Sequence, residues 1–160
     1  MTIAVVPDRD SMHALGSSIA GVLRAGDVVV LSGPLGAGKT TLTQGIGRGL
    51  NVRGDITSPT FVIARVHPST INGPALVHVD AYRLGSFIEV DDLDLDASLD
   101  ESVTVVEWGE GKVEGLADDR LHVTIERQVG DDEDDTRRVE LVGVGSRWAD
   151  VDLAAVGGVA

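Results

Sequence analysis

The stretch LSGPLGAGKTTLTQG, residues 31–45, places glycines directly before a predicted helix, although glycine is a poor helix former. Gly33 to Thr40 match the pattern G-x-x-x-x-G-K-[ST], between an apolar run of strand length, Val28–Leu31, and the predicted helix Lys39–Leu50. The glycines let several backbone N–H groups face phosphate oxygens at the positive end of the helix. The stretch therefore predicts a P-loop that binds the phosphates of a nucleotide.

The side chains of this loop have distinct expected roles. Lys39 should reach the β- and γ-phosphates, the Thr40 hydroxyl should take one Mg²⁺ position, and Thr41 could contact the α-phosphate. The alternative is a flexible loop in a chain that contains 20 glycines, but the strand before it and the helix after it favour the P-loop. The predicted phosphate-binding residues are Gly33, Pro34, Leu35, Gly36, Ala37, Gly38, Lys39, Thr40 and Thr41.

Two acidic residues stand at the ends of other predicted strands. Asp80 follows PALVHV in residues 74–82, and Glu107 follows VTVV in residues 103–111. Because a parallel sheet brings such strand ends to the edge that carries the P-loop, either acid could hold Mg²⁺ or orient an attacking water. An ordinary solvated acid at a strand end is the alternative for each. The residues themselves leave the division of roles between Asp80 and Glu107 open.

Composition limits the class of protein. With 160 residues, 42% of them apolar, the chain is long enough for one domain with a core. The net charge of −13 opposes independent binding to nucleic acid or anionic lipid, so a partner protein would hold any RNA. The absence of cysteine excludes disulfides and thiolate chemistry. The N-terminus lacks a basic leader, and no apolar run approaches the ~18 residues of a membrane span, which predicts a cytoplasmic protein.

The remaining pattern predicts one α/β domain. Three glycines weaken the helix Lys39–Leu50, so a packing partner must stabilise it. The fold class expected is a three-layer P-loop NTPase-like domain with a mainly parallel central sheet and added antiparallel strands. The expected domain covers residues 1–145, followed by a weakly ordered tail over 146–160. Further predicted elements are a helix over Asp10–Arg24, an antiparallel hairpin of 61–67 with 74–82, and strands at Leu121–Arg127 and Thr136–Val142.

Four motifs in order resemble the bacterial TsaE (YjeE) ATPases, which help to make threonylcarbamoyladenosine in tRNA. The resemblance runs from about residue 10 to residue 142, and its motifs are GPLGAGKTTLTQGIGRGL at 33–50, TSPTF at 57–61, HVDAYRL at 78–84 and VEWGE at 106–110. It implies that Lys39 and Thr40 bind phosphate and Mg²⁺, that Glu107 helps to hold Mg²⁺, and that Asp80 serves ATP hydrolysis. It also suggests a switch-like role for Ser58-Pro59-Thr60, in which the Thr60 hydroxyl could sense a γ-phosphate or its metal. A capped turn is the alternative for that segment.

The same resemblance implies a slow Mg²⁺-dependent ATPase that acts on the paired TsaB and TsaD proteins, which would carry the tRNA chemistry. No arginine stands out as an internal arginine finger, so a partner could supply the missing group or order the site. The acidic chain would suit a basic partner protein, and it would contact tRNA only through that partner. Two alternatives stay open: a small-molecule kinase, although no arginine-rich lid is evident, and a nucleotide-gated binding module. The adenine-binding residues, the oligomeric state and the acidic loop 131–135 have no assignment.

Overall fold

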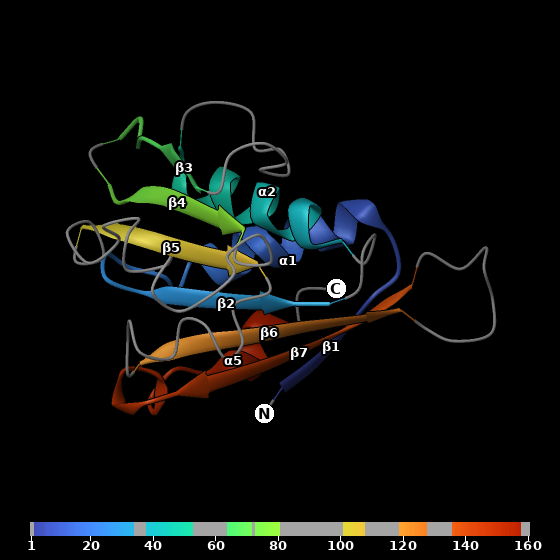
Figure 1. Ribbon diagram of the computed structural model, residues 1–160. Coiled ribbons are helices and arrows are strands. Elements are labelled where there is room, and N and C mark those ends of the chain that lie inside the picture. The colour runs from blue at the N-terminus through green and yellow to red at the C-terminus, as the bar shows by residue number, and fades with distance from the viewer. Residues whose placement is uncertain are drawn as a thin grey trace.

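The computed structural model describes residues 2–33, 38–52, 64–71, 73–80, 101–107, 119–127 and 136–157. Within these ranges the strands form one seven-stranded sheet in the order β1-β7-β6-β2-β5-β4-β3 (Figure 1). The strands are β1 (Thr2–Val6), β2 (Val28–Ser32), β3 (Ala64–His67), β4 (Ala75–Asp80), β5 (Ser102–Glu107), β6 (Arg120–Arg127) and β7 (Arg137–Val144). The helices are α1 (Arg9–Ala20), α2 (Lys39–Leu50), the 3-10 turn η2 (Ser146–Trp148) and α5 (Leu153–Gly157).

The centre of the sheet is parallel and its flanks are antiparallel. Strand β2 pairs in parallel with both β5 and β6, and β4 pairs in parallel with β5. Antiparallel pairs join β3 to β4, β7 to β6 and β1 to β7. The predicted α/β class, with a parallel centre and added antiparallel strands, and the predicted hairpin of β3 with β4 are therefore confirmed. The third layer of the predicted fold stays a prediction, because the described residues do not show it. Strand β1 was not predicted, and its pairing with β7 extends the sheet by one strand.

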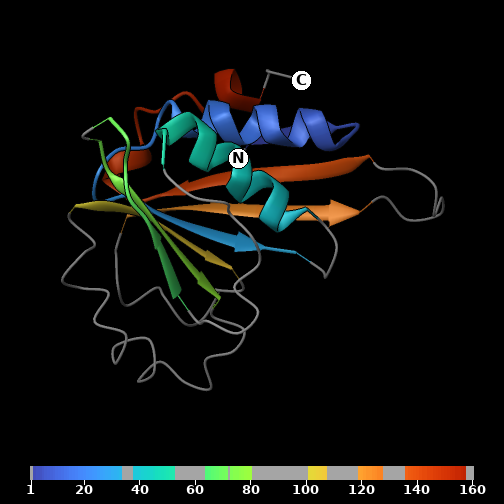
Figure 2. The ribbon, with the colours of Figure 1, turned by 90° about the horizontal axis from the view of Figure 1, so that it is seen from above.

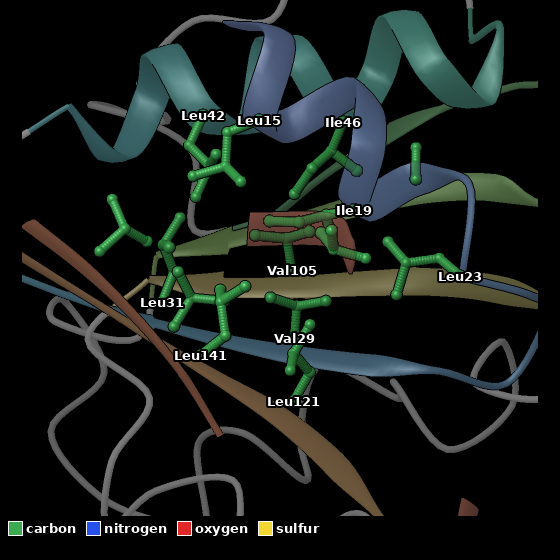
Figure 3. Close-up of a cluster of buried hydrophobic side chains, with 14 of the residues drawn as sticks. Leu15, Ile19, Leu23, Val29, Leu31, Leu42, Ile46, Val105, Leu121 and Leu141 are labelled. Atoms are coloured by element: carbon green, nitrogen blue, oxygen red, sulfur yellow. The ribbon is translucent and has the colours of Figure 1, made fainter. Parts of the chain in front are cut away.

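Strand β2 is buried on both faces, as its continuous apolar sequence predicts for a central parallel strand. Val29 and Leu31 point to one face, Val28 and Val30 to the other, and none of the four is more than 1% exposed. Helices α1, α2 and α5 lie together on one face of the sheet (Figure 2). Figure 3 shows Leu15, Ile19, Leu42 and Ile46 from α1 and α2 above Val29, Leu31, Val105 and Leu121 of the strands.

Helix α2 depends on α1 for its position, because glycines allow the two helices to approach closely. A Cβ added to Gly45 would lie 2.2 Å from the carbonyl oxygen of His13, and one added to Gly16 would lie 2.4 Å from that of Leu42. The hydroxyl of Ser17 donates a hydrogen bond of 3.1 Å to the Gly45 carbonyl. Close packing thus requires glycine at position 45, although glycine is a weak helix former. The sequence predicts that α2 needs a packing partner, and that partner is α1.

Helix α1 is shorter than the predicted helix Asp10–Arg24. Asp8 caps its start, since the carboxylate accepts a hydrogen bond of 2.8 Å from the Ser11 N–H, which lowers the pKa of Asp8 below its ordinary value. Gly21 ends it: its N–H reaches the carbonyls of the last turn, including that of Ile19, and the chain then turns toward β2. Within the ranges that the structure describes, no helix is both long enough and apolar enough to span a bilayer.

Part of the segment 146–160, which the sequence predicts to be a weakly ordered tail, packs against the domain in the structure. Trp148 of η2 and Val156 of α5 are only 4% and 6% exposed. The guanidinium of Arg147 donates hydrogen bonds of 3.0 and 2.9 Å to the two carboxylate oxygens of Asp27, just before β2. Apolar burial and a largely buried ion pair therefore attach this segment to the domain.

Candidate functional site

The predicted P-loop joins β2 to α2 at the edge where the parallel strands end (Figure 1). Gly33 follows β2, and Gly38 precedes α2 with a φ of 113°, a left-handed conformation that favours glycine. The Lys39 ammonium, on a residue only 7% exposed, donates a hydrogen bond of 2.7 Å to the Gly33 carbonyl. The lysine thereby connects the two ends of the loop. Residues 34–37 lie outside the described ranges.

The start of α2 has donors suited to phosphate. The first backbone N–H groups of an α-helix have no partner within the helix. In the part of the chain that the structure describes, no side chain caps this end of α2. A Cβ at Gly38 would also approach the Met12 methyl group to 3.2 Å, so a glycine keeps this turn compact. Backbone donors at a positive helix end, together with a buried lysine, fit an anion such as a phosphate.

The two predicted strand-end acids occupy neighbouring positions at this edge. In the strand register, Glu107 of β5 lies opposite Leu31 of β2 on one side and opposite Asp80 of β4 on the other. Leu31 stands two residues before Gly33, so the backbone brings both acidic positions beside the P-loop strand. Glu107 is buried, with 4% of its surface exposed. The predicted convergence of strand ends is confirmed at the level of the backbone.

A histidine of β4 contacts Glu107. His78 is a fully buried residue of β4, and its Nε2 lies 3.1 Å from Oε1 of Glu107. His78 pairs in register with Val105, and Val105 and Glu107 share a face of β5 because side chains alternate along a strand. The sequence shows that His78 precedes Asp80 by two positions. It does not show which residue of β5 lies beside it, since that depends on the register.

Two oxygen-bearing side chains near the P-loop are of the kind that binds Mg²⁺. Thr40, half-buried in the first turn of α2, offers a hydroxyl, and Glu107 offers a carboxylate. Mg²⁺ prefers oxygen ligands and is commonly bound by one or two protein groups together with water and substrate phosphates. In the described ranges, no group of three or more His, Cys, Asp and Glu side chains gathers to hold a metal. These donors therefore suit a metal that is shared with a bound phosphate.

The structure brings most of the predicted site to one edge. The described members are Gly33, Gly38, Lys39, Thr40, Thr41 and Glu107, together with the backbone of Asp80. Other predicted members lie outside the described residues: Pro34, Leu35, Gly36, Ala37, and Thr60 of the switch-like segment. Their predicted roles stay predictions. His78 is the neighbour that sequence reasoning did not connect with this site.

Comparisons with known proteins identify similar chains. A family model described as threonylcarbamoyl adenosine biosynthesis protein TsaE matches residues 6–139. A Streptomyces coelicolor protein named tRNA threonylcarbamoyladenosine biosynthesis protein TsaE is 63% identical over 148 residues, which cover 92% of this chain and 100% of that protein. A Bacillus subtilis protein of the same name is 38% identical over 140 residues, with 87% and 84% covered. The crystal structure of Bacillus subtilis YdiB superimposes with a TM-score of 0.72 at 31% identity, covering 91% of this chain and 87% of that one.

Proposed function

Because this chain belongs to the TsaE family, we propose that it acts in tRNA threonylcarbamoyladenosine biosynthesis as a Mg²⁺-dependent ATPase. The names of its relatives support the role in this biosynthesis. The ATPase activity rests on the site itself and on the resemblance of its motifs to those of the family. The same role favours a location in the cytoplasm.

One observation carries the assignment of ATP binding: the Lys39 ammonium lies 2.7 Å from the Gly33 carbonyl, at a helix start that no side chain of the described residues caps. A cation and several N–H donors directed at one place bind phosphate oxygens well. Lys39 would neutralise charge on the β- and γ-phosphates, and the backbone N–H groups at the start of α2 would donate hydrogen bonds to the phosphate oxygens. Thr41 would contact the α-phosphate.

Thr40 and Glu107 are the residues proposed to hold Mg²⁺, which when bound supplies positive charge at the transferred phosphoryl group. Asp80, at the adjacent strand end, would orient the attacking water as a general base or hydrogen-bond acceptor. Thr60 would respond to the γ-phosphate and couple its presence to the conformation of Ser58–Thr60. The roles of Asp80 and Thr60 rest on the resemblance and on strand order.

The proposed partner is the TsaB–TsaD pair, with tRNA held by that pair. A net charge of −13 would favour association with a basic surface and disfavour direct capture of tRNA. Without an evident internal arginine finger, hydrolysis by the chain alone should be slow, and a partner would complete or order the site. ATP binding and hydrolysis would then favour different partner-bound states.

Calorimetry with ATP and Mg²⁺ tests the binding proposal. Lys39→Ala should weaken ATP binding or abolish turnover, while the thermal unfolding curve stays cooperative. Arg48→Ala is the matched control, because it removes a positive charge from an exposed position in the last turn of the same helix. Wild-type affinity and turnover in Lys39→Ala would refute the P-loop assignment. Phosphorylation of a small metabolite by the isolated chain would instead identify a kinase.

A further inference from the structure

The contact between His78 and Glu107 joins two polar side chains in the interior of the sheet. The imidazole is 0% exposed and the glutamate side chain 6% exposed, and 3.1 Å separates Nε2 from Oε1. An imidazole N–H at that distance donates to the carboxylate oxygen. Among the described residues, no other side chain donates a hydrogen bond to this carboxylate. His78 therefore decides how one oxygen of Glu107 is held.

His78 is an unfavourable choice for a purely structural position. Its neighbours in β4, Leu76, Val77 and Val79, are buried apolar residues with at most 2% exposure. The second ring nitrogen of His78, Nδ1, is buried without a hydrogen-bond partner in the part of the chain that the structure describes. A buried polar atom without a partner destabilises a fold, and an apolar side chain would avoid that cost. The contact with Glu107 is what an apolar residue could not provide.

The position of the pair relates it to the candidate metal site. Glu107 stands opposite Leu31, at the end of the strand that leads into the P-loop. When one carboxylate oxygen accepts a hydrogen bond from a buried imidazole, rotation of the carboxylate is restricted and the other oxygen remains for a ligand. Groups that hold metal ligands in this way commonly change metal affinity or activity by about 10–100-fold when they are mutated.

We propose that His78 is a positioning residue of the metal site: its Nε2–H holds Oε1 of Glu107 and thereby orients Oε2 toward Mg²⁺. This inference rests on the proposed function, because Glu107 belongs to a metal site only under that proposal. His78 contacts neither nucleotide nor metal in this arrangement. Its effect reaches the metal only through Glu107.

The test measures Mg²⁺-dependent binding rather than turnover. Calorimetry follows a non-hydrolysable ATP analogue, adenylyl imidodiphosphate, first in EDTA and then at increasing Mg²⁺ concentration. His78→Leu should raise the Mg²⁺ concentration needed for half-maximal tightening by about 10–100-fold, with the affinity in EDTA unchanged. His78→Gln keeps an N–H donor and should recover most of the wild-type Mg²⁺ response. In a Glu107→Gln background, His78→Leu should add no further effect, because its only route to the metal has been removed.

Leu76→Val is the matched control for loss of stability. It disturbs the same face of the same strand two residues away and leaves the imidazole in place. Thermal unfolding should show a lower melting temperature for this variant, with a wild-type Mg²⁺ response. A wild-type Mg²⁺ response in folded His78→Leu would overturn the inference, as would a loss of affinity that is equal with and without Mg²⁺.

The same series separates this inference from the proposed function. A wild-type protein that does not bind the analogue, or binds it without regard to Mg²⁺, contradicts the proposed function and the role of His78 with it. A wild-type protein with a clear Mg²⁺ response, together with an unchanged His78→Leu variant, contradicts only the role of His78. Additive effects of His78→Leu and Glu107→Gln would also refute it.

Discussion

Gly45→Ala should destabilise the protein, although alanine is the better helix former. In an isolated helix this change would stabilise by about 1 kcal/mol. Here the new Cβ would lie 2.2, 2.9 and 3.0 Å from the O, C and Cα atoms of His13, all of them backbone atoms of α1. Ordinary contact begins near 3.4 Å, so α1 would have to move by about 1 Å and its packing would suffer. The hydrogen bond from Ser17 to the Gly45 carbonyl would weaken as well.

These opposing terms give a net loss. Overpacking costs about 1–3 kcal/mol or more, and a weakened hydrogen bond about 1 kcal/mol, against the gain of about 1 kcal/mol in helix propensity. We expect Gly45→Ala to lower the free energy of unfolding by about 1–3 kcal/mol, or the melting temperature by about 3–10 °C in a domain of this size. Urea unfolding followed by circular dichroism would measure the change.

Gly21→Ala is the matched control, because the same chemical change is made at the exposed end of α1. Gly21 has a φ of −63°, and its added Cβ would meet only the Ser18 carbonyl oxygen, at 3.2 Å. Its effect should stay within about 0.5 kcal/mol. A Gly45→Ala variant as stable as the wild type, or more stable, would refute the view that close helix approach positions α2 and Lys39.

Three further predictions concern charged groups. Arg147→Met should lower the free energy of unfolding by about 3–5 kcal/mol, because it leaves the 5% exposed Asp27 carboxylate without its guanidinium partner. An unchanged midpoint of urea unfolding would show that the ion pair is dispensable. The pKa of Asp8 is lowered in the folded protein, so its stabilising contribution is present above the ordinary value of 3.8 and is lost as pH falls through the folded pKa. The melting temperatures of Asp8→Ala and wild type should therefore converge in that acid range and differ at higher pH. Glu107→Gln should raise the Mg²⁺ requirement, whereas Asp80→Asn should lower single-turnover hydrolysis with nucleotide still bound; wild-type behaviour of both would remove these acids from the site.

Local sequence was sufficient for the elements around the P-loop. The apolar run before Gly33 predicts β2, and the glycine-lysine pattern predicts where α2 begins, because both signals lie within a few residues of the structure they specify. The family motifs also identified the acids at the ends of β4 and β5. The short distance in sequence between β3 and β4 also predicts their antiparallel pairing. The order of the seven strands in the sheet was not predicted.

Features that depend on distant partners could not be predicted in this way. Strand β1 has apolar residues on both of its faces, with Ile3 and Val5 exposed, and it pairs with a strand more than 130 positions away. The C-terminal segment is held by Arg147, whose partner Asp27 is 120 positions earlier. The contact of His78 with the P-loop edge depends on the register of β4 with β5. In each case the decisive contact is absent from the local pattern.

Under the proposed function, ATP hydrolysis at the P-loop of this chain drives tRNA threonylcarbamoyladenosine formation together with the TsaB–TsaD pair. The most direct measurement follows ATP hydrolysis and threonylcarbamoyl transfer to tRNA over many turnovers, with the pair alone, with wild-type chain added, and with Lys39→Ala added. We expect slow hydrolysis by the chain alone, stimulation by the pair, and sustained transfer only with the wild-type chain. Sustained transfer without the chain or with Lys39→Ala, and no stimulation of hydrolysis by the pair, would contradict the proposed function.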